Sequence, residues 1–380
     1  MPQKLRIGIA ACEPSGDLLG SELIQALRSK YSQLEFSGIA GPKMRAAGCE
    51  ALIKTEELSV MGLIEVLTQL RRLLKLRKQI VSYFLDNPPD LFIGIDSPDF
   101  NFGVEQRLKK SGIPIVHYVS PSIWAWRENR VNRIAGCVDL MLTLLPFEKT
   151  FYQRHNIAVE YVGHPLADSI PENLDQSEAR NKLGIDCSRP CIAFLPGSRM
   201  SEIKRMLPVF IKTMQYCLQQ KPSLSFVMPA ATPQLAAYMH QQVPAELDIH
   251  LIDGDAQSVM AAANVVLVAS GTATLECLLV KRPMVVTYIM HPVSFFLANR
   301  LLTVPYVSLP NHLAGKQVVP EYLQRAATAN TLGRALLEIL DNPDLQRTQT
   351  DCFYTIHKEL KKSASSRAAE IILGQWGQYA

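Results

Sequence analysis

Two carboxylates that follow a short apolar segment are the first candidates for chemistry in this sequence. Leu91–Ile95 is an uninterrupted apolar run, typical of a buried parallel strand, and Asp96 and Asp99 come shortly after it. In open α/β sheets, ligands bind beyond the carboxyl ends of the strands. A carboxylate there can act as a general base when a substrate proton comes within hydrogen-bond reach. Asp also caps helices, so one of the pair can cap the next helix while the other takes part in a reaction.

A tight turn in the second half of the chain predicts an anion-binding site. Gly197, Ser198 and Arg199 follow the apolar segment Cys191–Leu195 and precede a predicted helix. Glycine lets a ligand approach the backbone closely, and the first amides of a helix attract an anion. The guanidinium of Arg199 adds a permanent charge whose geometry matches phosphate. The alternative interpretation is an ordinary strand-to-helix turn.

A second turn of small residues lies further along the chain. Ser270, Gly271 and Thr272 follow Val265–Ala269 and open a predicted helix, an arrangement suited to a pyrophosphate. Glu276 falls in the first turns of that helix, where a carboxylate can accept hydrogen bonds from ribose hydroxyls. The helix dipole alone also favours a glutamate there. Together, the two turns predict a site for a nucleotide diphosphate.

Composition and missing motifs argue against several other functions. The net charge of +4 is too small to indicate a nucleic-acid-binding protein. The sequence has neither a P-loop motif nor GxGxxG, which disfavours a P-loop ATPase and the use of NAD. The eight cysteines form no CxxC pair, so reduced cytosolic thiols fit better than zinc or disulfides. Asp253-Gly254-Asp255 resembles a metal motif, but its surroundings favour a solvated turn. We therefore expect no metal and no cofactor.

These candidate residues require parallel strands to position them, and the sequence alternates short apolar segments with amphipathic ones. A chain of 380 residues, 48% apolar and 19% charged, fits two soluble α/β domains. The predicted strands are Leu5–Ala11, Glu35–Ala40, Leu91–Ile95, Pro114–Val119, Val138–Leu144, Val159–Val162, Cys191–Leu195, Leu224–Met228, Ile249–Leu251, Val265–Ala269, Met284–Ile289 and Tyr306–Ser308. The main predicted helices are Gly16–Ser29, Val66–Phe84, Phe102–Lys110, Thr331–Leu340, Pro343–Lys361 and Ala364–Gln375.

A polar segment divides the two halves. Asp168–Pro190 contains prolines, a glycine and several acidic residues, and we interpret it as a linker that leads into a second domain. Each half predicts a doubly wound, Rossmann-like parallel sheet, which gives an α/β protein with domains at 1–167 and 168–345. Ligand sites favour the cleft between two such domains. No apolar stretch is long enough to span a bilayer.

The motifs of both halves together resemble those of the lipid-A-disaccharide synthases, bacterial glycosyltransferases of the GT-B architecture. The resemblance extends over nearly the whole chain, and its two most specific blocks are Asp96-Ser-Pro-Asp99-Phe-Asn101 and Trp124-Ala-Trp126-Arg127. The other matching segments include Glu13-Pro-Ser15-Gly-Asp17, Ala40-Gly-Pro-Lys-Met44, Val60-Met-Gly-Leu-Ile-Glu-Val66, Leu145-Pro-Phe-Glu-Lys149, Leu195-Pro-Gly-Ser-Arg199, Ser270-Gly-Thr-Ala-Thr-Leu-Glu276 and Tyr306-Val-Ser-Leu-Pro-Asn311. The resemblance implies that the two domains face a cleft and that the helices of 346–380 return to the first domain.

The resemblance also implies a reaction. UDP-2,3-diacylglucosamine would donate its sugar to 2,3-diacylglucosamine 1-phosphate, with inversion at the anomeric carbon, giving UDP and a β-1,6-linked lipid A disaccharide 1-phosphate. Such a displacement requires a base on the acceptor's 6-hydroxyl and stabilisation of the leaving UDP. Asp96 matches the position of the base, Asp99 is the alternative, and no metal is required.

The other matched positions are expected to bind the substrates. The diphosphate would be held by Gly197, Ser198, Arg199, Ser270, Gly271 and Thr272. Glu276 would hold the ribose, and Asn311 would line the cleft on the UDP side. Glu13 and Ser15 would face the same cleft from the first domain. Trp124 and Trp126 could contact sugar or acyl groups, and a buried aromatic pair is an equal alternative.

The acylated substrates imply contact with the cytoplasmic surface of the inner membrane. Leu67–Val81 predicts a basic amphipathic helix, with Leu67, Leu70, Leu74 and Val81 on one face and Arg71, Arg72, Lys75 and Lys78 opposite. A core-packed helix with a solvated basic face is the alternative. Val60–Ile64 is a candidate lipid-contacting loop. Members of the family also dimerise through their C-terminal helices, so a homodimer is expected.

Two other functions share parts of this prediction. A UDP-N-acetylglucosamine 2-epimerase would have the same two-domain fold and UDP site, but it would need neither a lipid surface nor a second sugar. The basic helix and the Trp124–Arg127 block therefore disfavour it. A nucleotide-sugar-binding protein at the membrane surface would make Asp96 dispensable.

Overall fold

The computed structural model describes residues 4–58, 63–126, 130–291 and 304–377, apart from the side chains of 63–69, 125 and 126. The chain divides into two compact units. Unit 1 comprises Met1–Asp168 and Leu360–Ala380, and unit 2 comprises Ser169–Glu359. Unit 2 is therefore one continuous segment inserted between the two segments of unit 1.

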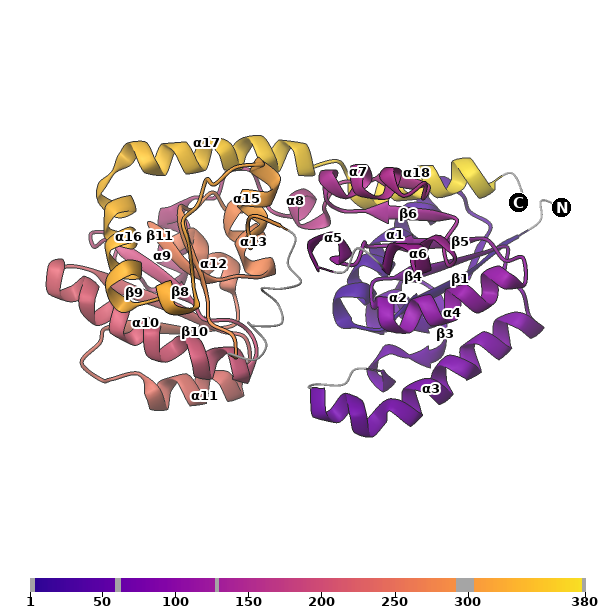
Figure 1. Ribbon diagram of the computed structural model, residues 1–380, viewed down its shortest axis with the longest axis horizontal. Helices are drawn as coiled ribbons and strands as arrows, with labels where there is room; N and C mark the ends of the chain where they lie inside the picture. The colour runs from indigo at the N-terminus through magenta and orange to yellow at the C-terminus, as the bar shows by residue number, and fades with distance from the viewer. Residues whose placement is uncertain (1–3, 59–62, 127–129, 292–303, 378–380) are drawn as a thin grey trace. The chain divides into compact units, whose positions relative to one another are not determined.

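Unit 1 is built on a seven-stranded sheet in the order β3-β2-β1-β4-β5-β6-β7, with parallel pairing throughout (Figure 1). Its strands are β1 (Leu5–Ala11), β2 (Leu34–Ala40), β3 (Cys49–Lys54), β4 (Leu91–Ile95), β5 (Ile115–Tyr118), β6 (Leu140–Thr143) and β7 (Val159–Tyr161). Its helices are α1 (Pro14–Lys30), α2 (Pro42–Ala46), η1 (Thr55–Glu57), α3 (Leu63–Asp86), α4 (Pro98–Lys110), α5 (Ile123–Trp126), α6 (Val131–Ala135), α7 (Pro146–Arg154), α8 (Pro165–Ser169, at the boundary) and α18 (Ala364–Trp376).

Helices cover both faces of this sheet, because successive strand side chains point to opposite sides. On one face, α1 and the C-terminal helix α18 pack with the odd-numbered side chains of β1, and Ile372 of α18 is fully buried there. On the other face, α3 and α4 pack with Ala10 and Phe92 through side chains such as Phe84 and Val104. The last helix of the chain is thus part of the core formed by the first strand.

Unit 2 has a six-stranded parallel sheet in the order β10-β9-β8-β11-β12-β13. Its strands are β8 (Cys191–Leu195), β9 (Ser225–Ala230), β10 (Ile249–Asp253), β11 (Val265–Ala269), β12 (Met284–Tyr288) and β13 (Glu321–Leu323). Its helices are α9 (Gln176–Leu183), α10 (Met200–Gln220), α11 (Pro233–Gln242), α12 (Ala256–Ala262), α13 (Thr272–Leu279), α15 (Leu309–Ala314), η3 (Gln324–Ala326), α16 (Ala329–Asp341) and α17 (Pro343–Leu360).

The core of unit 2 is separate from those of unit 1. Phe194 of β8 packs edge-on against Phe210 of α10 and Phe226 of β9, with ring centroids 5.6 and 5.5 Å apart. Helices α10, α11 and α16 supply the other apolar side chains on this face. Two parallel sheets flanked by helices establish the predicted α/β architecture.

One edge of each sheet differs from the prediction. Tyr306–Ser308 is not a strand, because the carboxylate of Glu321 accepts the backbone N–H groups of Val307 and Ser308, both at 3.0 Å. The edge strands β3 and β13 were not predicted. The segment that we interpreted as a linker contains α9, in which the buried Arg180 donates to the carbonyl of Ala262 at 2.8 Å. That helix belongs to unit 2.

The second boundary between the units falls at Glu359 and Leu360. Helix α17 therefore belongs to unit 2 and α18 to unit 1, whereas the resemblance implied that the helices of 346–380 return together to the first domain. Asp168 holds the start of α18, since its carboxylate accepts the N–H groups of Ser363 at 2.8 Å and Ala364 at 2.6 Å. Such charged acceptors at a helix N-terminus stabilise the helix.

Candidate functional site

In each sheet, successive strands are added first toward one edge and then toward the other, and the place where this direction changes is the switch point of the sheet. The candidate residues lie near these two switch points. In unit 1 the chain leads from β1 to β2 on one side and from β4 to β5 on the other. Ala11 of β1 pairs with Ile95 of β4, so Glu13 and Asp96 follow neighbouring strand ends. Glu13 and Ser15 are exposed at the start of α1, and Asp96 is partly buried. Ligands of doubly wound sheets bind at this kind of switch point.

The backbone at Asp96 is held in an unfavourable conformation. Asp96 and Ser97 have φ angles of 49° and 45°, and Val119, just after the neighbouring strand β5, has a φ of 85°. L-amino acids seldom adopt positive φ, and such residues concentrate at functional sites. The carboxylate of Asp96 makes no hydrogen bond or ion pair with the residues that the structure describes, so it is available to a substrate.

Asp99 lies in a different environment. Its side chain is 90% exposed in the first turn of α4, and its Oδ1 lies 3.5 Å from Nη1 of Arg130. An acidic residue in a first turn interacts favourably with the helix dipole, and an exposed ion pair contributes little. The placement therefore favours Asp96 over Asp99 as the reacting carboxylate.

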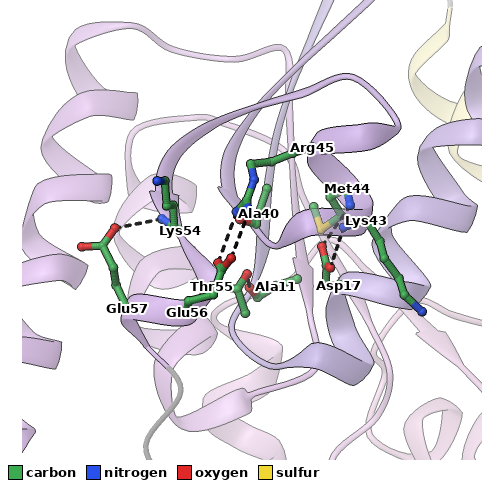
Figure 2. A network of polar contacts seen from close by, with 10 residues as sticks. All are labelled: Ala11, Asp17, Ala40, Lys43, Met44, Arg45, Lys54, Thr55, Glu56 and Glu57. Atoms are coloured by element: carbon green, nitrogen blue, oxygen red, sulfur yellow. Dashed lines mark hydrogen bonds and ion pairs between the residues drawn. The ribbon is translucent and has the colours of Figure 1, made fainter.

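A polar network involves Ala11 at the end of β1 and Asp17 near the start of α1 (Figure 2). Glu13 and Ser15 lie between these two residues, at the N-terminus of α1. The buried carboxylate of Asp17 accepts the backbone N–H groups of Lys43 at 2.9 Å and Met44 at 3.0 Å, which caps α2 from another helix. Gly41 is needed beside it, because a Cβ there would lie 2.4 Å from the carboxyl carbon of Asp17. This contact joins the two sequence blocks around Asp17 and Met44.

The same network reaches the end of β1. Thr55, directly after β3, donates its hydroxyl to the carbonyl of Ala11 at 2.7 Å. Arg45 donates to the carbonyl of Ala40 at 3.0 Å and pairs with Glu56 at 2.9 Å (Figure 2). Together these bonds connect the carboxyl ends of β1, β2 and β3, and they fix where the loop after β1 begins.

Trp124 is tied to the neighbouring helix α7. Its indole Nε1 donates to Oε1 of Glu148 at 3.2 Å, and its ring lies edge-on to Phe147 with centroids 4.6 Å apart. Glu148 is buried, and this burial raises the pKa of its carboxyl group to about 8. Trp124 is thus partly buried and anchored by Glu148, while the side chain of Trp126 lies outside the described residues.

In unit 2 the order reverses between β8 and β11, where Leu195 pairs with Val268. The two predicted phosphate-binding turns follow these two strands, so the structure brings them to neighbouring positions at one edge of the sheet. Gly197 has a φ of 116°, a conformation that favours glycine.

The first turn contains a carboxylate that the sequence analysis did not use. Glu202 accepts the backbone N–H groups of Ser198 at 3.1 Å and Arg199 at 3.2 Å through Oε2. Its Oε1 lies 3.3 Å from Nη1 of Arg199, whose side chain is 79% exposed. Two amides expected to meet an anion are therefore occupied by a capping glutamate, and the guanidinium of Arg199 remains accessible.

The second turn is more open. Gly271 and Thr272 are exposed, and the amide of Thr274 donates to the carbonyl of Gly271 at 3.1 Å. The amides of Thr272 and Ala273, at the start of α13, have no acceptor within the helix. Ser270 donates its hydroxyl to the carbonyl of Val307 at 3.0 Å, which fixes the turn. Glu276 is partly buried, and desolvation raises the pKa of its carboxyl group. Hydroxyl donors of a ligand would offset that desolvation.

Asn311 lies in the interior of unit 2. Its amide nitrogen donates to the carbonyl of Val319 at 2.9 Å and to Glu321 at 2.8 Å, and its oxygen accepts the N–H groups of Val318 and Val319. The side chain is fully buried and all four of its hydrogen-bonding positions are used. Direct contact with UDP stays a prediction, and the observed bonds give Asn311 a role in holding the segment between α15 and β13.

The apolar side chains of helix α3 do not form one continuous buried face: some are buried and others are exposed. Ile80, Val81 and Phe84 are buried, whereas Leu70 and Leu74 are 47% and 44% exposed. Arg71, Arg72, Lys75 and Lys78 are exposed around these two leucines. The side chain of Leu67 and most of the proposed loop Val60–Ile64 lie outside the described residues. None of the helices in the described ranges is both long and apolar enough to cross a bilayer.

The structure thus collects Glu13, Ser15 and Asp96 at one switch point, and Gly197, Ser198, Arg199, Ser270, Gly271 and Thr272 at another. The supporting roles of Asp17, Glu148 and Glu202 were missed. A signal existed for Glu202, which stands three residues after Arg199, the spacing of a capping box. Asp253 and Asp255 form no metal cluster among the described residues, and Asp255 instead caps α12 and pairs with Lys182 at 2.6 Å.

Two Rossmann-like units with candidate ligand residues at both switch points define the GT-B class of two-domain α/β proteins. Solved structures agree with this fold over nearly the whole chain. A UDP-GlcNAc 2-epimerase from Neisseria meningitidis bound to UDP-GlcNAc aligns with a TM-score of 0.60 at 12% identity, covering 99% of this chain and all of that one. A calicheamicin glycosyltransferase aligns with a TM-score of 0.61 at 15% identity, covering 100% of both chains.

Sequence comparison gives the particular family. The model of the lipid-A-disaccharide synthetase family matches residues 7–373. A lipid-A-disaccharide synthase from Cellvibrio japonicus is 49% identical over 374 residues, which cover 98% of this chain and 97% of the relative. The enzyme of the same name from Vibrio cholerae is 48% identical over 376 residues, covering 98% and 99%. The chain belongs to the lipid-A-disaccharide synthetase family.

Proposed function

We propose that this protein is an inverting glycosyltransferase that makes the lipid A disaccharide. It transfers the sugar of UDP-2,3-diacylglucosamine to 2,3-diacylglucosamine 1-phosphate and releases UDP. The observation that carries this proposal is the family match over residues 7–373, which includes the residues at both switch points. A cleft between the units and a homodimer through the C-terminal helices stay predictions.

Asp96 is the proposed base. It takes the proton of the acceptor's 6-hydroxyl as that oxygen attacks the anomeric carbon, and the bond to the UDP oxygen breaks on the opposite face. Its position after β4, its positive φ and its lack of a polar partner among the described residues support this role. Asp99 is exposed and paired with Arg130, which favours a surface role.

The residues of unit 2 are the proposed donor site. The exposed guanidinium of Arg199 and the open turn Ser270–Thr272 stabilise the negative charge of the leaving diphosphate. Glu276, partly buried and without a polar partner among the described residues, accepts from the ribose hydroxyls. This arrangement supplies positive charge without a metal ion.

The activity is tested with purified protein and both diacylated sugars, with UDP release and disaccharide followed in parallel. Wild-type protein should form both products in equal amounts. Asp96→Asn should lose roughly 100-fold or more in rate, the usual contribution of a general base. Asp99→Asn is the matched control and should lose little, because its carboxylate is exposed. Release of UDP without disaccharide from wild type would contradict the proposed reaction.

We further propose that the N-terminal half of α3 binds the anionic inner surface of the membrane. Leu70 and Leu74 offer apolar side chains among four exposed basic residues. Basic side chains near an anionic surface contribute about 1 kcal/mol each, and buried leucines add to this. A cytoplasmic protein that reaches acylated substrates in this way requires no transmembrane helix.

Sedimentation with lipid vesicles tests this surface. Wild-type protein should bind vesicles that contain phosphatidylglycerol more strongly than neutral vesicles. The double variant Leu70→Ser, Leu74→Ser should bind less, while Leu85→Ser should bind as wild type does. Leu85 is a matched control, since it is 44% exposed near the other end of the same helix. Equal binding by all three proteins would exclude this part of α3 as the contact.

A further inference from the structure

The side-chain amide of Asn101 lies directly beneath the turn that carries Asp96. Asn101 is fully buried in the first turns of α4. Its Nδ2 lies 2.8 Å from the carbonyl oxygen of Asp96, 3.1 Å from that of Ile95 and 3.4 Å from that of Ala10. The two hydrogens of one amide therefore serve three carbonyl groups where β1 and β4 end.

These bonds fix the peptide that follows Asp96. The carbonyl of Asp96 is held by Asn101, and its N–H donates to the carbonyl of Tyr118 on β5 at 2.8 Å. Both sides of the residue are thus anchored, so the direction of its Cα–Cβ bond is set by α4 and β5. Without the amide, the positive φ angles of Asp96 and Ser97 would lose the contact that offsets their cost.

A buried pair of side chains holds α4 against β5. Oε1 of Glu105, one turn after Asn101 on the same face of the helix, lies 2.6 Å from Nδ1 of His117, and both side chains are fully buried. Gly94 makes room for this contact, because a Cβ there would lie 1.9 Å from Oε1 of Glu105.

The second polar atoms of this pair, Oε2 of Glu105 and Nε2 of His117, have no hydrogen-bond partner among the described residues. Unpaired buried polar atoms are costly, so a purely structural contact would be better made by apolar side chains. The pair instead fixes α4 at one register and one distance on the strand next to β4. This sets the position of Asn101 relative to Tyr118.

We propose that Asn101 is a positioning residue for the base, and that the pair of Glu105 and His117 holds Asn101 in place. The inference rests on the proposed function, because it assigns these residues to the orientation of Asp96 in that reaction. Asn101 touches neither substrate; it acts through the backbone of Asp96. A base displaced by about 1 Å loses on the order of 100-fold in rate.

A double-mutant cycle tests the proposal with the full-length protein. Asn101→Ala and Asp96→Asn should each reduce kcat roughly 100-fold. If Asn101 acts only through Asp96, the double variant should be no slower than Asp96→Asn alone, because residues that act as a unit are not additive. Multiplied losses in the double variant would overturn the proposal.

Further variants keep the test decisive if Asn101→Ala folds poorly. Asn101→Asp has the same shape but removes the amide donor, and it should show the same loss of kcat with an unchanged KM for the UDP-sugar. Glu105→Gln keeps a hydrogen-bonding side chain of equal size and should retain more activity than Glu105→Ala. An Asn101→Asp protein with normal kcat would overturn the proposal.

Asn87→Ala is the matched control. Asn87 also donates its amide to a carbonyl, that of Tyr83 at 3.2 Å, but it is exposed at the end of α3. This variant should have wild-type kcat. Absence of disaccharide from wild-type protein would overturn the proposed function and this inference with it, whereas wild-type turnover with additive losses would overturn the inference alone.

Discussion

At the scale of single residues, the surroundings of each carboxylate decide its task. Asp17 and Glu202 both accept two backbone N–H groups, so they cap helices and have little capacity left for a ligand. Asp96 makes no such contact with the described residues and lies where substrates of doubly wound sheets bind. Residue type alone does not distinguish a capping carboxylate from one that is available to a ligand. The number of backbone N–H groups that donate to the carboxylate does distinguish them.

Glu148 gives a prediction about pH. Its native pKa is about 8, whereas an unfolded chain releases this proton near pH 4.3. Between these two pH values, Glu148 keeps its proton in the folded protein but has released it in the unfolded chain. The free energy of unfolding therefore falls as the pH rises, by up to about 1.4 kcal/mol per pH unit. The contribution is favourable below the unfolded pKa and is lost by about pH 8.

The variant Glu148→Gln has nearly the same shape and no proton to release. We expect its free energy of unfolding, relative to wild type, to improve steadily from pH 5 to pH 8. Denaturant titrations at these pH values measure this, since the other titrating groups are common to both proteins. Tryptophan fluorescence follows the correct unit, because Trp124, Trp126 and Trp376 all belong to unit 1. A constant difference between the two proteins would contradict the burial of an uncharged Glu148.

The sequence placed the candidate site residues in the fold better than it placed their supporting contacts. Asp96 and Glu276 could be placed because each follows an apolar strand by a short interval. The bonds of Asn311 could not be foreseen, since its partner Glu321 stands ten residues away and only the folded chain brings them together. The contact of Asp17 with the start of α2 likewise joins residues 26 and 27 positions apart. Local patterns carry no information about such partners.

At the scale of secondary structure, several central strands were predicted with the bounds that the structure shows. The observed bounds of Leu5–Ala11, Leu91–Ile95, Cys191–Leu195 and Val265–Ala269 equal the predicted ones. All four are central strands of their sheets, and their sequences are mostly apolar. The unpredicted β3 and β13 are edge strands whose sequences mix polar and apolar residues. Tyr306–Ser308 has residues typical of a strand, but the N–H groups of Val307 and Ser308 donate to the carboxylate of Glu321 rather than to a neighbouring strand.

Helix α18 yields a prediction at this scale. Ile372 is fully buried against the sheet face that includes β1, so Ile372→Ala removes packed methyl groups and leaves a cavity. We expect the free energy of unfolding of unit 1 to fall by about 2–5 kcal/mol. Gln375→Ala, at an exposed position of the same helix, should change it by no more than about 0.5 kcal/mol.

Tryptophan fluorescence during denaturant unfolding measures both α18 variants. Binding of UDP serves as a second readout, because the proposed donor residues all lie in unit 2. It should be the same in both proteins. Equal stability of Ile372→Ala and wild type would mean that α18 is not part of the unit 1 core in solution.

At the scale of the whole molecule, the two units differ in how many segments of the chain form them. Unit 2 is continuous, whereas unit 1 needs its last segment, Leu360–Ala380, to complete its core. The two ends at which unit 2 is inserted lie close together within unit 1. His164 donates its backbone N–H to the carbonyl of Leu360 at 2.9 Å, and Asp168 caps α18. Insertion at neighbouring ends leaves both folding units intact.

This connectivity predicts how fragments behave. Residues 169–359 alone should fold and bind UDP, because their core is self-contained. Residues 1–168 alone should aggregate or unfold, since the apolar face covered by α18 would meet water. Joining 168 to 360 through a short Gly/Ser linker should restore a cooperatively unfolding unit 1.

Circular dichroism and tryptophan fluorescence of the three fragments measure these outcomes, and calorimetric titration with UDP tests the first. The linked fragment 1–168 plus 360–380 is the decisive one, because it differs from the unstable fragment only by the linker and the returning segment. Cooperative unfolding of 1–168 without that segment would show that α18 is dispensable, and the packing of Ile372 and Trp376 would then contribute far less than their burial indicates. A stable linked fragment would establish that the enzyme consists of two independent folds, with the proposed base on one and the proposed UDP site on the other.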